Sequence, residues 1–211
     1  MARHDETAQG RTLLPLVGQP PVERADAARN RRALLAAAQR ILNDSGVEAL
    51  SMDRVAADAC VGVGTVYRRF GSRAGLAYAL LHETERQFQA AYFAGPPPLG
   101  PGATPITRIE AFLHAYVDRL ETEADLHAMG ETSAPTARQQ TGAYRTARAH
   151  LVGLLTSAGM TGDLSYLAEA LLAPLAAGLF LHQRRELQFS ADRIKAGLDR
   201  LLDGLLSTTD Q

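Results

Sequence analysis

The sequence predicts an all-α protein built from two helical regions. Apolar residues recur three and four positions apart through residues 22–93 and again through residues 106–206, which is the spacing of amphipathic helices. No stretch alternates apolar and polar residues as a half-buried strand does, and no internal repeat is present. Residues 94–105 hold five prolines and three glycines, a composition that no helix can cross. We therefore expect a helical N-terminal domain, a Pro/Gly loop and a larger helical C-terminal domain.

Charge and composition limit the classes of partner. The chain has 211 residues, of which 46% are hydrophobic and 21% charged, with a net charge of -1. Any contact with nucleic acid must therefore come from a local patch. Of the 22 basic residues only Lys195 is a lysine, and the planar fork of arginine suits phosphate and guanine.

Cysteine usage and the N-terminal residues indicate the compartment. A single cysteine excludes an internal disulfide framework and fits a reducing environment. Residues 1–21 lack periodicity, contain three prolines and predict a mobile tail rather than a signal peptide. No apolar run reaches the length of about 20 residues that a membrane span needs. We expect a cytoplasmic protein without a membrane partner.

Four helices are expected in the first region. The first covers about residues 25–44, where the leucine and alanine stripe has helical spacing. Ser51 is a natural N-cap for a short second helix, and a third helix begins after Gly62 and ends at Gly71. Ser72 caps a fourth, leucine-rich helix. Residues 51–70 thus form a helix, a tight turn and a second helix, which is a helix-turn-helix motif.

The glycines of "CVGVG", residues 60–64, raise the alternative of a dinucleotide-binding loop. Such a loop needs G-x-G-x-x-G between a buried strand and a long helix. Here a helix precedes the glycines, the third glycine is absent, and the following helix is about two turns long. The context therefore favours DNA over a nucleotide, and we expect no cofactor.

The third helix presents groups that suit DNA. Val66 and Phe70 face inward, which leaves Gly64, Thr65, Tyr67, Arg68 and Arg69 facing outward. Hydroxyl and amide groups bind phosphate, and an arginine fork reads guanine in the major groove. Residues 22–73 carry nine arginines against six acidic residues, whereas residues 74–211 have a net charge of -4. The alternative for these arginines is an ordinary solvated face.

A family resemblance rests on this segment. "GVEALSMDRVAADACVGVGTVYRRF", residues 46–70, followed by Ser72, Arg73 and a leucine-rich helix, resembles the DNA-binding domain of TetR-type (tetracycline-repressor-like) transcriptional regulators. The resemblance covers about a quarter of the chain, and it implies a homodimer, a three-helix DNA-binding domain and a C-terminal domain that binds an effector. With it, the predicted DNA contacts are Ser51, Gly62, Val63, Gly64, Thr65, Tyr67, Arg68, Arg69, Ser72 and Arg73.

Two positions depart from the family pattern. Cys60 stands where the turn usually has a glycine, and a left-handed backbone there costs about 1 kcal/mol. We expect Cys60 to be a small buried residue, and a redox sensor is the alternative. Gly75 occupies the third position of the fourth helix, where a glutamate would complete a capping box. We therefore expect that helix to fray at its start.

The second region predicts helices of less distinctive pattern. One helix begins near Ile106, followed by a shorter, broken segment over residues 121–134. Another opens at Pro135 or Thr136 and ends before Gly159. We expect these helices to form a mostly apolar effector pocket.

The last two helices predict the oligomeric state. One starts at Asp163 or Ser165, is apolar on two faces and should be kinked at Pro174, as a hinge or as a tolerated packing feature. Ser190 caps the other. A helix that is apolar on two faces must be covered on both, so we expect a homodimer through these two helices, with a monomeric core as the alternative.

Polar residues of this region are candidates for effector contacts, and His114 and His182 have the alternative of being surface or satisfied core histidines. No H-x-x-x-H, C-x-x-C or Ser-His-Asp pattern is present, so we expect neither a metal site nor catalysis. The favoured function is a ligand-responsive repressor that binds palindromic double-stranded DNA and is released by a small hydrophobic effector. A helical enzyme or an interaction module, in which the motif serves packing only, stays open. The candidate effector contacts are His114, Tyr116, Glu131, Tyr144, Arg145 and His182.

Overall fold

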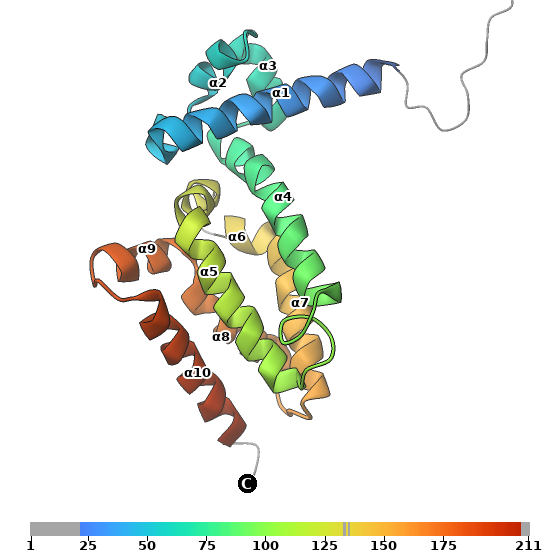
Figure 1. Cartoon of the computed structure of the whole chain (residues 1–211), viewed down its shortest axis with the longest axis vertical. Coiled ribbons are helices and arrows are strands. Elements are labelled where there is room, and N and C mark those ends of the chain that lie inside the picture. Colours follow the sequence, from blue (N-terminus) through green and yellow to red (C-terminus); the bar gives the residue numbers. More distant parts are fainter. Residues whose placement is uncertain (1–21, 133, 135, 208–211) are drawn as a thin grey trace, which may run out of the picture.

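The structure is a computed structural model that describes residues 22–132, 134 and 136–207. The predicted mobile tail, residues 1–21, lies outside these residues. Within them the chain forms α-helices and short 3-10 turns without a strand, which confirms the all-α prediction. Figure 1 shows an elongated molecule in which helices α1 to α3 gather at one end, helices α5 to α10 gather at the other, and α4 runs between them.

The N-terminal end is a three-helix unit joined to a fourth helix. It comprises α1 (Val22–Ser45), a 3-10 turn (Val47–Ala49), α2 (Met52–Asp58), α3 (Val63–Phe70) and the start of α4 (Arg73–Ala94). These helices enclose a core of buried residues that includes Leu34, Ala38, Leu50, Val55, Val66, Leu76 and Leu81.

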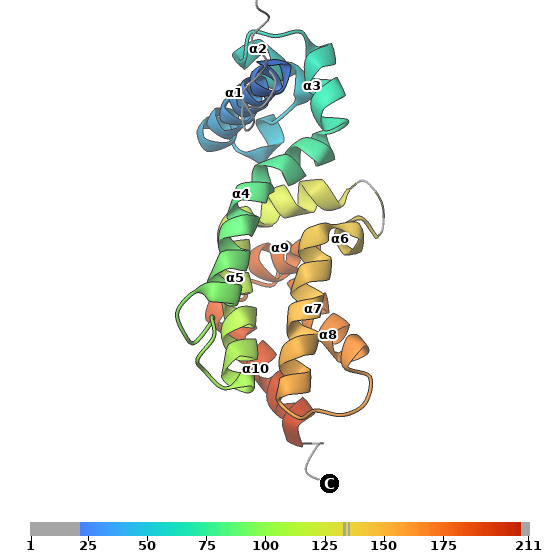
Figure 2. The same ribbon diagram turned by 90° about the vertical axis from the view of Figure 1, so that its right-hand side faces the viewer.

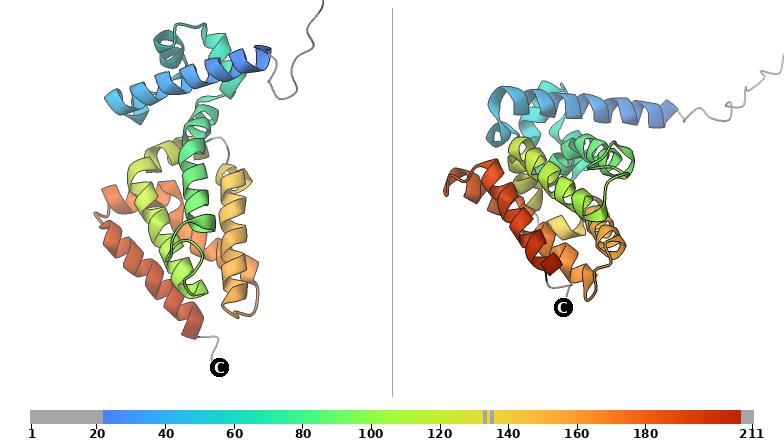
Figure 3. Two further views of the ribbon diagram at one scale, coloured as in Figure 1. Left: turned by 45° about the vertical axis from the view of Figure 1, so that its right-hand side comes forward. Right: turned by 60° about the horizontal axis from the view of Figure 1, so that its bottom comes forward.

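The larger end is a bundle around α5. It contains α5 (Pro105–Glu131), α6 (Ala137–Gln140), α7 (Gly142–Ser157), α8 (Leu164–Leu172), a 3-10 turn (Ala173–Leu175), α9 (Ala177–Arg185) and α10 (Ala191–Ser207). Figures 2 and 3 show α4 and α5 side by side, and in the left view of Figure 3 α7 lies on one side of this pair and α10 on the other. The core of this bundle includes Tyr92, Ile109, Phe112, Leu113, Leu151, Leu155, Leu171, Leu172, Phe180 and Leu198.

Two helices belong to both cores. Helix α4 places Leu76 in the N-terminal core and Tyr92 in the bundle. The last turns of α5 return toward the N-terminal end, where Leu126 and Met129 pack into its core. A change in the packing of α4 on α5 would therefore reach both ends of the molecule.

One expectation for the second region is wrong, and another is confirmed. Residues 121–131 continue α5 instead of forming a broken segment, because Leu126 and Met129 extend its buried face. Glycine at position 130 allows α5 to pack closely against α4, since a Cβ there would lie 2.9 Å from the ring of Tyr78. The kink expected at Pro174 is confirmed: the 3-10 turn that contains Pro174 separates α8 from α9, and the two helices are bent by 42°.

No single helix in the described part of the chain is long and apolar enough to cross a membrane. Residues 164–175 and 177–185 reach that length and composition only as a bent pair. Leu171, Leu172 and Phe180 of this pair lie in the core of the bundle.

Candidate DNA-binding surface and effector cavity

The helix-turn-helix is fixed by local hydrogen bonds that the sequence predicts. The Ser51 hydroxyl accepts a hydrogen bond from the backbone N–H of Arg54 at 3.2 Å and so caps α2. In the turn, the N–H of Val61 donates to the carbonyl of Ala56 at 2.9 Å. Val66 is fully buried, which fixes the rotation of α3 about its own axis and leaves its opposite face in solvent.

The outward face of α3 is polar and unoccupied. Tyr67 is 50% exposed and Val63 is 37% exposed. The side chains of Tyr67 and Arg68 make no hydrogen bond or ion pair with the residues that the structure describes. A Cβ at Gly62 or Gly64 would meet nothing within 4 Å, so this end of α3 is open to close approach by another molecule. This surface can donate hydrogen bonds and positive charge to a phosphate backbone.

Two predicted DNA contacts are instead held within the domain. Arg69 donates from Nη2 to the carbonyl of Ala27 on α1 at 3.0 Å. Arg73 donates from Nε to the carbonyl of Leu50 at 2.7 Å and from Nη2 to that of Val47 at 2.8 Å. These bonds tie α3 and α4 to their neighbours, so a phosphate contact by either guanidinium stays a prediction.

The two departures from the family pattern have structural explanations. Cys60 has a left-handed φ of 54°, as expected for the turn, but its side chain is exposed, so the expectation of a buried cysteine is wrong. Gly75 is required sterically, because a Cβ there would lie 2.0 Å from the carbonyl oxygen of Phe70. Its N–H donates to the Ser72 hydroxyl at 3.1 Å, so α4 begins with a formed cap, and the structure gives no support to the expected fraying.

A cavity of about 430 Å³ lies between α4, α5, α6 and α7. Among the predicted effector contacts, Tyr116, Glu131 and Tyr144 line it. Apolar surface comes from Leu81, Phe88 and Ala147. The cavity includes residues of α4 from Tyr78 onward, within a few residues of the N-terminal core.

Three other predicted effector contacts lie outside this cavity. Arg145 lines a separate groove between α7 and the loop before α5, together with Phe93, Arg108 and His150. His114 pairs with Asp199, and His182 pairs with Glu186 four residues later on the surface. Each of these histidines thus has an acidic partner, and a contact of either with an effector stays a prediction.

The cavity carries paired charges that sequence reasoning did not place there. Arg119 is 8% exposed, bonds to the carboxylate of Glu85, and donates to Glu123 at 2.6 Å. Burial alone would lower the Arg119 pKa, but the two carboxylates raise it. For Glu123, burial raises the pKa, but the His127 imidazole, whose Nε2 lies 3.4 Å from the carboxylate, and the charge of Arg119 outweigh it and hold the pKa below its usual value. The Arg119–Glu123 spacing of four was a readable signal, whereas the Glu85 partner comes from another helix.

A second pair sits at the end of the cavity near the N-terminal core. Arg138 lies 3.6 Å from Glu131 and donates to the carbonyls of Leu172 and Leu175 at 3.1 and 3.2 Å. Its guanidinium also lies 4.8 Å from the ring centre of Tyr144. Burial raises the pKa of Glu131. Most of the cavity lining is apolar, as predicted, and these charged pairs add a polar part to it.

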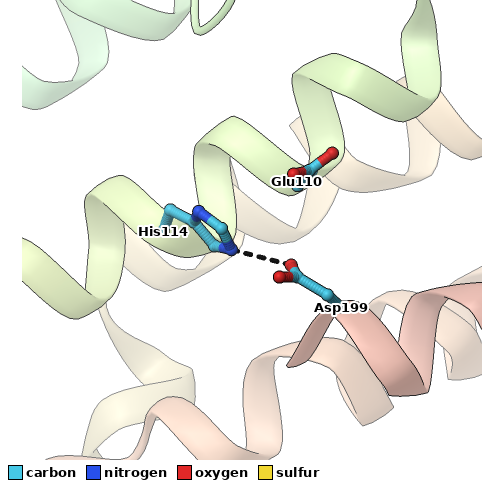
Figure 4. Close-up of side chains that lie close together, drawn as sticks. All are labelled: Glu110, His114 and Asp199. Carbon is cyan, nitrogen blue, oxygen red and sulfur yellow. Dashed lines mark hydrogen bonds and ion pairs between the residues drawn. The ribbon is translucent and has the colours of Figure 1, made fainter. Parts of the chain in front are cut away.

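Three potential metal ligands meet away from the cavity. Figure 4 shows His114 and Glu110 on α5 with Asp199 on α10, and the His114 ring directed at the Asp199 carboxylate. The ligand atoms of the three side chains lie within 4.8 Å of one another. The spacing of four between Glu110 and His114 was a readable signal, whereas Asp199 is 85 residues from His114 and could not be placed from the sequence.

Comparison with known proteins identifies the N-terminal domain. Residues 34–80 match the family model described as bacterial regulatory proteins, tetR family. An HTH-type transcriptional regulator of Staphylococcus aureus strain USA300 is 36% identical over 58 residues. This match covers 28% of the chain and 31% of that relative, so it spans less than a third of the relative's length.

Solved structures resemble the whole chain. A transcriptional regulator from a Rhodococcus species has a TM-score of 0.62 at 22% identity, covering 86% of this chain and 98% of its own. A TetR-family regulator from Streptomyces coelicolor has a TM-score of 0.58 at 19% identity, covering 87% and 97%. A regulator from Saccharomonospora viridis in complex with choline has a TM-score of 0.61 at 16% identity, covering 83% and 96%. These likenesses confirm the predicted fold, and all three proteins are regulators rather than enzymes.

Proposed function

We propose that this chain, whose residues 34–80 belong to the tetR family of bacterial regulatory proteins and whose fold is that of TetR-type regulators, is a dimeric, ligand-responsive transcriptional repressor acting in the cytoplasm. The observation that carries the proposal is the free outward face of α3. Tyr67 and Arg68 are exposed there, while Arg69 and Arg73 secure the surrounding domain. A rigid domain with unoccupied polar groups on a helix of this length suits the major groove.

The proposed dimer uses the surface of α8 to α10. Large apolar side chains are exposed along these helices, and burying each would stabilise an interface by about 1–3 kcal/mol. A twofold dimer presents two copies of α3, which is the arrangement that reads an inverted repeat. The exposed apolar residues are Tyr166 at 70%, Leu179 at 43%, Leu187 at 47% and Leu201 at 53%.

The proposed effector occupies the cavity beside α4. Because the cavity combines Phe88, Tyr116 and Leu81 with paired charges, the effector has an apolar body and at least one polar group. The choline complex of the S. viridis regulator supports a small-molecule effector for a chain of this fold. Tyr78 and Gly130 are in contact where α4 crosses α5, so a ligand that separates these helices would shift the N-terminal domain and release DNA.

Selection of bound fragments from a random double-stranded library, followed by footprinting, tests the DNA-binding proposal. We expect an inverted repeat with half-sites about one helical turn apart and binding that weakens steeply with salt. A monomer that protects a single half-site, or binding without sequence preference, would overturn it. Analytical ultracentrifugation of Leu201→Glu tests the dimer, since the exposed charge should leave monomers that keep the wild-type fold.

Two glycine variants of α7 test the cavity. A Cβ at Gly142 or at Gly153 would meet nothing within 4 Å, so leucine at either position should fold. Gly142 lines both the cavity and the second groove, whereas Gly153 lines the groove alone. Small molecules that release the selected DNA from the wild type should fail on Gly142→Leu and work on Gly153→Leu. Release from Gly142→Leu but not from Gly153→Leu would indicate that the effector binds in the groove. Equal release from both variants would indicate that it binds in neither place.

A further inference from the structure

A ladder of ion pairs joins α5 to the two helices that pack along it. Its acidic groups recur on one face of α5 at spacings of three and four residues, and each meets a basic group of α9 or α10. The pairs are Asp125 with Arg185 at 2.6 Å, Glu121 with Arg184 at 2.5 Å, and Asp118 with Lys195 at 2.5 Å. In each of these rungs one acid is balanced by one base.

The next step of the ladder breaks this pattern. On the same face of α5, His114 Nε2 lies 2.7 Å from Asp199 Oδ1 of α10, and Glu110 follows one turn away. Two carboxylates therefore flank one imidazole. Glu110 makes no ion pair or hydrogen bond with the described part of the chain. Among the described residues no arginine or lysine forms an ion pair with Glu110 or Asp199, so acidic groups outnumber basic groups at this end of the ladder.

We propose that Glu110, His114 and Asp199 form a binding site for a divalent transition-metal ion of the zinc class. An imidazole with two carboxylates suits zinc and its neighbours, whereas calcium and magnesium prefer oxygen ligands alone. His114 and Asp199 are 29% and 35% exposed, so the ion would bind at the edge of the helix interface, with water completing its coordination.

The geometry needs only a small adjustment. Around a tetrahedral zinc ion, ligand bonds of about 2.1 Å place the ligand atoms about 3.4 Å apart, so the 2.7 Å contact between His114 Nε2 and Asp199 Oδ1 would widen by about 0.7 Å. The three ligand atoms already lie within 4.8 Å of one another. Glu110 is exposed and unpartnered, so its side chain can close the remaining gap at little cost. Its carboxylate in Figure 4 lies on the same side of α5 as the His114 ring.

A bound ion would link α10 to α5 at His114 and Asp199, the pair of this series without an arginine or lysine. The ion replaces the missing positive charge and links residues that are 85 positions apart in sequence. Because an ion that binds only the folded state stabilises it, the protein should melt at a higher temperature in its presence. This inference is independent of the proposed regulation, since neither α3 nor the effector cavity contributes a ligand.

Titration of the full chain with Zn²⁺ tests the site, using protein without an affinity tag that has been treated with a chelator. We expect calorimetry to give one ion per chain, Co²⁺ to give a visible absorption band, and Zn²⁺ to raise the melting temperature. His114→Ala should weaken Zn²⁺ binding by at least about 10-fold, since even partners of a metal ligand contribute that much. Glu110→Gln should weaken it too, and its folding is secure because the native side chain has no partner in the described residues.

His182→Ala is the matched control. His182 pairs with Glu186 at 2.9 Å, and the described residues place no third potential ligand beside them, so this variant should bind Zn²⁺ like the wild type. The proposal is overturned if the wild type binds no stoichiometric ion, if Glu110→Gln and His114→Ala bind as the wild type does, or if His182→Ala loses binding equally. Circular dichroism of each variant shows whether it is folded. If His114→Ala does not fold, Zn²⁺ binding by Glu110→Gln tests the proposal instead.

Discussion

The two ends of the molecule use arginine in opposite ways. On α3, Arg68 is exposed and has no partner among the described residues. In the bundle, Arg119 and Arg138 are about nine-tenths buried, and carboxylates, carbonyls or rings take up their charge. A surface that meets a polyanion gains from unpaired cations, which displace counterions when DNA arrives. A cavity that stands empty between ligands must balance its charges internally, because an unpaired buried charge is costly.

The largest effect that tests this contrast is loss of the buried guanidinium. Arg119→Met should lower the free energy of unfolding by about 3–5 kcal/mol, because it leaves the largely buried carboxylates of Glu85 and Glu123 without the guanidinium that they share. Urea unfolding followed by circular dichroism measures the change. Arg40→Met is the matched control at the other end, where the Arg40–Asp58 pair is 57% and 36% exposed and should contribute less than about 1 kcal/mol. Equal losses in both variants would contradict the contrast.

The features that the sequence could predict in the N-terminal domain depend on contacts between residues that are near one another in the chain. The caps at Ser51 and Ser72, the turn at Cys60 and the inward position of Val66 depend on residues within a few positions of each other. Local spacing determines such features, so they can be read directly from the order of residues. The outward residues of α3 follow from the inward ones.

Features of the bundle depend on pairs from distant helices. Glu85 meets Arg119 across 34 positions, and Asp199 meets His114 across 85. Sequence periodicity indicates that a helix has a buried face, but it does not say which partner helix covers that face. The continuous α5 was missed for a related reason, since its last turns pack against the N-terminal core rather than against the bundle.

A pair of arginine variants sharpens the difference between binding and support within the N-terminal domain. Arg68→Ala should weaken the best operator by about 1–3 kcal/mol without changing thermal stability, because its side chain has no partner in the described structure. Arg73→Ala should destabilise the domain by about 1–3 kcal/mol, because the carbonyls of Leu50 and Val47 lose a charged donor. Fluorescence anisotropy with labelled operator and thermal melting separate the two effects. A stable Arg73→Ala that fails to bind would instead assign Arg73 directly to the phosphate backbone.

Acid should destabilise the bundle because the half-buried His150 ring is neutral in the folded protein. Burial, with a smaller contribution from the charge of Arg108, lowers the pKa of His150 to about 4. The unfolded chain takes up this proton below about pH 6.5, while the folded chain does so only near pH 4. Stability contributed by neutral His150 is therefore present at pH 7 and is lost as the pH falls between these values.

Unfolding measured at pH 7 and pH 5 checks this expectation. After allowance for partial exposure of the ring, the loss should be about 1–2 kcal/mol. His150→Phe should remove that part of the pH dependence and still pack, since the rings of Tyr92, Phe93 and Phe112 lie 4.5, 5.4 and 5.5 Å from the His150 ring. An unchanged slope in His150→Phe would assign the acid sensitivity to another group.

The smallest expected effect separates positioning from base reading on α3. Tyr67 offers one hydroxyl, which has no partner in the described residues and which we assign to a phosphate. Tyr67→Phe should therefore weaken binding to every DNA sequence alike, by about 0.5–1.5 kcal/mol, without a change in the melting temperature of the protein. Arg68→Ala, by contrast, should weaken binding most to the best operator and much less to operators in which the contacted base pair is altered. Binding of both variants to a panel of singly substituted operators measures the difference. If Tyr67→Phe changes base preference and Arg68→Ala does not, the two roles are exchanged, and α3 lies rotated in the groove relative to this assignment.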